Sequence, residues 1–181
     1  MNFYPFSPYF LVGVYIIANI LAFLLIFAST RYPKLTRLFF LLLFGWAFWI
    51  NSSMAIDSPW VYQDYADSSI PLYKKFILGT FEAIMTPMVL IIAAGQALLA
   101  ILMTLKGKLF KIGCWGGIVF CLAVSPIGSY AAFPATLFMA IALYLLQRDH
   151  NHLYIWERHP EDLKKGVPSQ QNKTRANYLI G

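Results

Sequence analysis

Long apolar runs, separated by short polar stretches, are the main pattern of this chain. A helix needs about 20 mostly apolar residues to cross a hydrocarbon core about 30 Å thick. The pattern predicts five membrane-spanning helices, at about residues 9–29, 38–56, 83–105, 109–124 and 131–147. The expected fold class is therefore an all-α membrane protein, with one N-terminal helix followed by a four-helix unit in a single domain, residues 1–147.

The last two predicted spans come from one apolar stretch, residues 109–147. As a single helix it would be about 60 Å long, which no bilayer requires. Ser125, Pro126, Gly128 and Pro134 interrupt it, and proline and glycine favour a turn over a continuous helix. An alternative with four spans and a re-entrant segment would place the basic tail outside, against the usual distribution of positive charge.

The positions of Lys and Arg predict the orientation of the chain. They lie mainly in the links 31–37 and 106–111 and in the polar tail 148–181, so that only Lys74 and Lys75 remain in the outer loop. Because cytoplasmic segments carry an excess of Lys and Arg, we expect the N-terminus outside and the tail in the cytoplasm. Residues 1–8 carry no charged side chain, so the first apolar run is expected to remain as a span.

Composition supports the lipid bilayer as the main partner. Hydrophobic residues make up 59% of the chain and charged residues 12%, whereas about 25% of a soluble domain is charged. The formal net charge of +6 does not indicate nucleic-acid binding, because the positive residues lie between apolar runs and in the tail. No nucleic-acid partner is expected.

A candidate binding pocket lies where the second and third spans approach the outer surface. If these helices are neighbours, several polar and aromatic side chains would converge on an outward-facing cavity. They are Trp46, Trp49, Asn51, Asp57, Glu82 and Gln96. Such a cavity would hydrogen-bond a quinone, a lipid head group or a small polar substrate. The open alternative is that the tryptophans form an aromatic belt, Asn51 caps a helix end and the acids lie in water.

Small residues mark surfaces for close helix packing. Gly113 and Gly117 form a GxxxG motif, and Ala93 and Ala97 are four residues apart on the third span. Small residues at this spacing let two membrane helices approach closely. The contact would form within the chain or between copies, and the pattern favours the first in a protein with several spans.

The sequence carries no recognisable catalytic motif. GxSxG, HExxH and the P-loop are all missing, so no catalytic residue is assigned, and a protein that is not an enzyme on its own is favoured. Haem and metal are not expected, because His150, His152 and His159 all lie in the tail. Cys114 and Cys121 are about 10 Å apart along a helix, too far for a disulfide.

Three features occur in order between residues 37 and 147. They are the apolar run that follows Arg37, the polar loop around Asp57, and a third helix that ends at Lys106. In this order the chain resembles the DoxX-like family of small bacterial membrane proteins. The resemblance implies a four-helix bundle in the bacterial cytoplasmic (inner) membrane. It also implies an accessory or quinone-interacting subunit of a redox system, with other membrane subunits as partners. Gln96 stands where an acid is expected, which puts proton transfer there in doubt.

Two other functions remain open at this point. One is a small carrier or lipid-binding protein that uses the outer aromatic pocket. The other is a non-catalytic assembly partner that docks another subunit through its GxxxG face. Its cofactor is unknown, with a quinone as the candidate.

Overall fold

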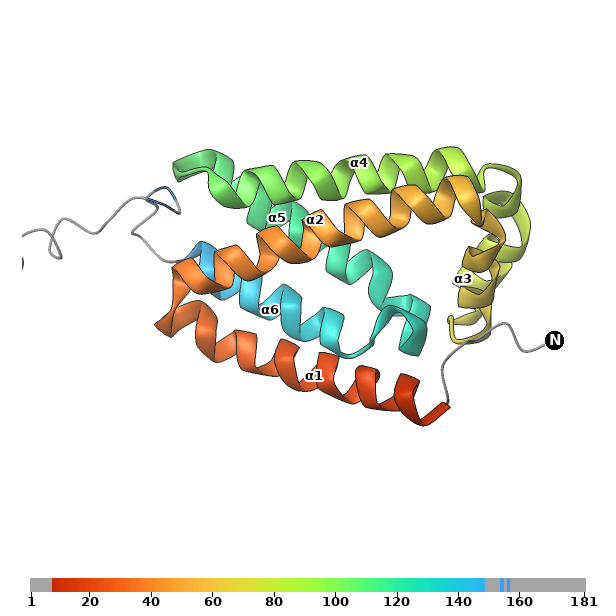
Figure 1. The fold of residues 1–181 in the computed structure, drawn as a ribbon, viewed down its shortest axis with the longest axis horizontal. Helices are drawn as coiled ribbons and strands as arrows, with labels where there is room; N and C mark the ends of the chain where they lie inside the picture. Colours follow the sequence, from red (N-terminus) through yellow and green to blue (C-terminus); the bar gives the residue numbers. More distant parts are fainter. Residues whose placement is uncertain (1–7, 149–153, 155, 157–181) are drawn as a thin grey trace, which may run out of the picture.

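The computed structural model describes residues 8–148, 154 and 156, and in this part of the chain all regular elements are helical (Figure 1). Five longer helices carry the architecture: α1 (Pro8–Arg31), α2 (Pro33–Asp57), α4 (Met85–Thr104), α5 (Gly107–Val124) and α6 (Ala135–Gln147). The shorter elements are η1 (Pro59–Asp67), α3 (Pro71–Phe76), η2 (Ile77–Phe81) and η3 (Ser125–Ala131). The predicted tail 148–181 lies almost entirely outside the described residues, and its three histidines lie wholly outside them.

Four helices, α1, α2, α4 and α5, are long and apolar enough to cross a membrane. Their outward faces are apolar as well, as Ile17, Phe27 and Ile91 illustrate. A helix that is apolar on all sides is typical of a membrane environment. The all-α class is therefore confirmed, together with four long apolar helices that could span a membrane.

The fifth apolar helix is shorter than predicted. α6 has 13 residues, so it is about 20 Å long at 1.5 Å per residue. The preceding residues form η3 and a turn, in which Gly128 has a φ of 85° and Ala132 a φ of 58°. These left-handed backbone positions end the helical run, so α6 begins only at Ala135. That α6 crosses the membrane stays a prediction.

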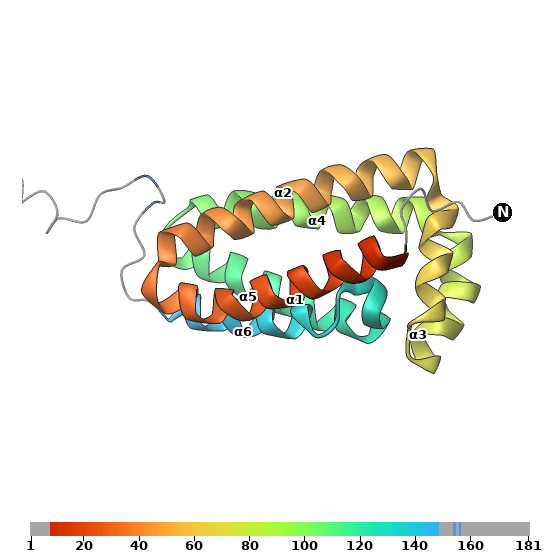
Figure 2. The ribbon, with the colours of Figure 1, turned by 60° about the horizontal axis from the view of Figure 1, so that its bottom comes forward.

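The long helices run up and down beside one another (Figures 1 and 2). α2 packs along α4, α1 packs along α6, and α5 packs between α4 and α6. The turns between α1 and α2 and between α4 and α5, with the end of α6, share one end of the bundle, which we call the basic end. η1, α3, η2 and η3 form the opposite end, which we call the loop end.

Charged side chains separate between these two ends. The described Lys and Arg residues of the basic end are Arg31, Lys34, Arg37, Lys106, Lys108, Lys111 and Arg148. The loop end has Lys74 and Lys75 and every acidic residue that the structure describes: Asp57, Asp64, Asp67 and Glu82. The bundle is therefore electrically polar along its long axis.

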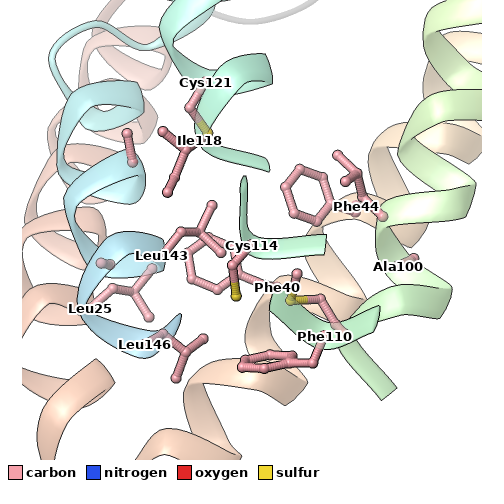
Figure 3. Close-up of a cluster of buried hydrophobic side chains, with 14 residues drawn as sticks. Leu25, Phe40, Phe44, Ala100, Phe110, Cys114, Ile118, Cys121, Leu143 and Leu146 are labelled. Atoms are coloured by element: carbon pink, nitrogen blue, oxygen red, sulfur yellow. The ribbon is translucent and has the colours of Figure 1, made fainter. Parts of the chain in front are cut away.

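Two apolar clusters hold the bundle together. The larger lies between the long helices, where Phe40 and Phe44 of α2 meet Cys114 of α5 and Leu143 and Leu146 of α6 (Figure 3). The smaller lies at the loop end and consists of Ala55, Tyr62, Ala66, Ile77, Phe81, Met85 and Val89. The second cluster fixes η1 and η2 against α2 and α4, and so positions the loop end.

The small residues of α5 pack inside the chain. A Cβ atom on Gly113 would lie 2.7 Å from Cβ of Leu102 in α4, and one on Gly117 would lie 2.8 Å from Cδ1 of Leu143 in α6. Both distances are shorter than a van der Waals contact, so the glycines permit the observed helix approach. Ala93 in α4 is buried as well, whereas Ala97 is partly exposed.

Hydrogen bonds close the loop end. The Ser68 hydroxyl donates to the carbonyl of Ile127 at 2.7 Å, and the Ile70 amide donates to the carbonyl of Pro126 at 3.1 Å. A Cβ on Gly128 would lie 2.2 Å from the Ser68 carbonyl oxygen, so only glycine fits there. Across this end runs α3, followed by η2.

Candidate functional site

Two of the predicted pocket residues hydrogen-bond each other inside the bundle. Gln96 of α4 is only 3% exposed, and its Oε1 accepts a hydrogen bond of 2.9 Å from Nδ2 of Asn51 in α2. The Tyr62 hydroxyl from η1 donates to Oδ1 of Asn51 at 2.9 Å. A buried amide is costly unless it is hydrogen-bonded. This network therefore gives each amide a hydrogen-bond partner and ties α2, α4 and η1 together.

The environment of Tyr62 keeps its hydroxyl protonated. Burial, together with the neighbouring Tyr65, raises its pKa from the ordinary value of 10.0 to about 12. The two rings stack with their centroids 5.9 Å apart. Tyr62 is therefore a hydrogen-bond donor to Asn51 over the whole physiological pH range.

Glu82 lies in a separate groove at the loop end. The groove has a volume of about 360 Å³ and is lined by Pro59, Trp60, Gln63, Glu82, Ala83, Met85, Thr86 and Pro87. Nε2 of Gln63 donates a hydrogen bond of 3.0 Å to Oε1 of Glu82. Trp60 is 63% exposed, so one aromatic ring stands at the surface of the groove.

Local folding explains how this groove forms. Pro59 begins η1 directly after α2, and Trp60 and Gln63 are three residues apart on it. Since a 3₁₀ helix has three residues per turn, these two side chains share a face. Thr86 lies in the first turn of α4 and donates to the carbonyl of Ala55 at 3.1 Å, which fixes α4 against the end of α2.

Of the six predicted pocket residues, only Glu82 lines this groove, while Asn51 and Gln96 pair with each other. Trp46 and Trp49 are exposed on α2, at 64% and 68%, and Asp57 is exposed where that helix ends. The periodicity of α2 separates the amide from the indoles, because residues two or five apart face different directions.

Among the polar and aromatic residues of the groove, three were not expected from the sequence: Trp60, Gln63 and Thr86. Pro59 and Trp60 belong to a loop that the sequence marks only as polar and aromatic. The three-residue spacing of Trp60 and Gln63 indicates that they share a face, because a helical turn that begins at a proline would bring them to one side. Thr86 becomes recognisable only once α4 is known to pack against the end of α2.

Arg37 was expected to mark orientation only, yet it is 4% exposed. Its Nε donates to the carbonyl of Met103 at 3.1 Å, and an Nη atom donates to the carbonyl of Leu105. Its guanidinium also lies over the ring of Phe110. Arg37 thus satisfies carbonyls at the C-terminal end of α4, where the helix dipole favours a positive charge.

The groove is suited to binding by hydrogen bonds and charge. Glu82 supplies an acceptor with negative charge, Thr86 and Gln63 supply polar atoms, and Trp60 supplies a ring face that attracts cations. No family model, curated protein or solved structure matches this chain. The DoxX-like resemblance therefore stays a prediction.

Proposed function

We propose that this chain is a five-span membrane protein whose basic end lies in the cytoplasm and whose loop end lies outside. The separation of charge supports this orientation, because Lys and Arg concentrate on the cytoplasmic side of membrane proteins. In this arrangement α6 and η3 together make the fifth crossing. The groove around Glu82 then opens at the outer surface of the membrane.

The proposed function is to bind an amphiphile with an ammonium or hydroxyl head group in this groove. The observation that carries it is the position of an exposed carboxylate, Glu82, in the same groove as the exposed ring of Trp60. A carboxylate beside an aromatic face is a suitable receptor for a cationic or hydrogen-bond-donating head group. The apolar tail of the ligand would lie along the exposed apolar faces of the helices.

Other polar positions give less support to a function. Asn51 and Gln96 are engaged with each other, so a substrate passing between α2 and α4 would have to break their hydrogen bond. Gly113 and Gly117 face neighbouring helices of the same chain, which leaves the GxxxG surface without room for a second subunit. A binding protein therefore fits the structure better than an assembly partner that docks through these glycines.

The test is to purify the tagged protein from its own membrane in mild detergent and identify the bound amphiphiles by mass spectrometry. We expect one class of amphiphile at near-equal molar amount on the unmodified protein and a large loss on Glu82→Gln and on Trp60→Ala. Asp67→Asn is the matched control, because Asp67 is an exposed acid of the same end that pairs with Lys74 at 3.9 Å and does not line the groove.

The outcomes separate the functions that remain. Bulk lipids in bulk proportions, or equal retention by all three variants, would contradict amphiphile binding at the groove. A quinone recovered in stoichiometric amount, together with a dehydrogenase partner, would instead favour the accessory redox subunit predicted from the resemblance.

A further inference from the structure

A pair of aromatic rings joins α5 and α6 on the outside of the bundle. Trp115 of α5 and Tyr144 of α6 meet edge to face, with ring centroids 6.4 Å apart. Both rings are about half exposed. Such rings, apolar with one polar atom, prefer the boundary between hydrocarbon and head groups.

Each ring has a basic residue one helical turn closer to the basic end. Lys111 precedes Trp115 by four residues on α5, and Arg148, the residue directly after α6, follows Tyr144 by four residues. We call the outer surface along the contact of α5 and α6 the seam. Because the two helices are antiparallel, both cations lie at the same end of the seam. The Arg148 guanidinium carbon is 5.7 Å from the centre of the Tyr144 ring, and both cationic residues are exposed.

The seam continues as an apolar surface beyond the rings. Val119 follows Trp115 by one turn on α5, Ile141 precedes Tyr144 by about one turn on α6, and both are exposed. The order along the seam is therefore two cations, two interfacial rings and then aliphatic side chains. Among the described residues, all acids lie at the opposite end of the bundle.

We propose that this seam binds an anionic phospholipid of the cytoplasmic leaflet. Lys111 and Arg148 hold the phosphate, Trp115 and Tyr144 lie at the level of the glycerol, and the acyl chains lie along Val119 and Ile141. Basic sites between helices on the cytoplasmic side are a known way to bind anionic head groups. The assignment to the cytoplasmic leaflet rests on the proposed orientation, whereas lipid binding at these residues does not depend on the groove at Glu82, which lies at the other end of the molecule.

The experiment is native mass spectrometry of the full chain in mixed micelles that contain phosphatidylglycerol or phosphatidylcholine. The unmodified protein is expected to retain phosphatidylglycerol preferentially. Lys111→Gln combined with Arg148→Gln should lower that preference by about tenfold or more, since each basic residue near the surface adds to the attraction. Lys74→Gln combined with Lys75→Gln is the matched control, because it removes the same charge at the loop end.

A second measurement locates the lipid. Phosphatidylglycerol with brominated acyl chains should quench the fluorescence of Trp115 more than phosphatidylcholine with the same brominated chains does. This difference should disappear in the Trp115→Phe variant. Because these side chains are exposed, the variants should keep the thermal stability of the unmodified protein in neutral detergent, which excludes misfolding as the cause.

Three results would overturn the proposal. The first is equal retention of the two lipids by the unmodified protein. The second is an equal loss of preference in the control and in the double variant at the seam. The third is competition by inorganic phosphate at the concentration of the lipid head group, because it would indicate a site for a small anion rather than for a phospholipid.

Discussion

The guanidinium carbon of Arg37 lies 4.2 Å from the centre of the Phe110 ring, and the same side chain hydrogen-bonds carbonyls at the end of α4. One residue near the start of α2 thus contacts both α4 and α5. A buried guanidinium requires this set of acceptors, since leaving it without them would be very costly. The contact fixes the turn between α4 and α5 against α2.

Replacing Arg37 should destabilise the bundle more than replacing an exposed arginine. Arg37→Gln loses charge-assisted hydrogen bonds and the cation–π contact, and we expect a loss of about 2 to 3 kcal/mol. The measurement is reversible unfolding in mixed detergent micelles. Arg31→Gln is the control, because Arg31 is exposed, and equal effects of the two changes would contradict the role assigned to Arg37.

The Asn51–Gln96 hydrogen bond should appear as coupling in a double-mutant cycle. Gln96→Leu leaves Nδ2 of Asn51 without its acceptor. Asn51→Leu leaves Oε1 of Gln96 without its donor and also removes an acceptor of the Tyr62 hydroxyl, so each change should cost about 1 kcal/mol or more. The double variant should lose less than the sum, because it leaves no unpaired amide in this position. Additive losses, measured by the same unfolding method, would show that the two amides do not depend on each other.

Gly117 and Gly95 should respond in opposite directions to alanine. A Cβ on Gly117 would meet Leu143 and Phe44, whereas a Cβ on Gly95 has nothing within 4 Å. Gly117→Ala should destabilise by about 1 to 3 kcal/mol through overpacking. Gly95→Ala should stabilise by up to about 1 kcal/mol, because alanine favours a helix. Equal thermal stability of both variants would show that α5 does not depend on this close approach.

Stability should depend on Tyr62 at high pH. Its pKa is raised from 10.0 to about 12 in the folded protein, so the unfolded chain loses this proton first. The contribution of Tyr62 is therefore complete below pH 10 and is lost as the pH rises to 12. The difference in melting temperature between the unmodified protein and Tyr62→Phe should shrink over that interval. A difference that stays constant would contradict the raised pKa.

Chemical labelling tests the proposed orientation. In a background of Cys114→Ala and Cys121→Ala, a new cysteine at Lys108 should be shielded in intact cells from a membrane-impermeant maleimide. A cysteine at Asp64 should react, because the loop end is placed outside. The reverse pattern would show that the topology is the opposite of the one proposed. Labelling of both positions before cell lysis would show that the chain does not cross the membrane between them.

The helices could be predicted from the sequence because apolar runs of spanning length have few alternative structures. The interruption at residues 125–134 was correctly identified, since proline and glycine act through local backbone geometry. The start of α6 was placed four residues too early, at 131 instead of 135. That boundary depends on η3 packing against η1, a contact between segments far apart in the chain.

The groove was harder to predict than the helices. Glu82 was recognised because a charge beside an apolar run is unusual, and Asn51 and Gln96 because polar amides inside such a run are unusual. Glu82 lines the groove, whereas Asn51 and Gln96 hydrogen-bond each other inside the bundle. This separation depends on the rotation of α2 about its own axis. Hydropathy gives almost no information about that rotation here, because both the inner and outer faces of the helix are apolar.

The shortness of α6 has a consequence for the membrane around it. If α6 crosses the membrane as proposed, its regular helix of about 20 Å is shorter than the hydrocarbon thickness of an average bilayer, so the bilayer beside α6 would have to become locally thinner or the polar ends would have to reach further. The free-energy cost of thinning the bilayer is lowest where acyl chains are short or loosely ordered. On this side of the bundle, the protein would therefore favour thin membrane regions and be excluded from thick, sterol-rich ones.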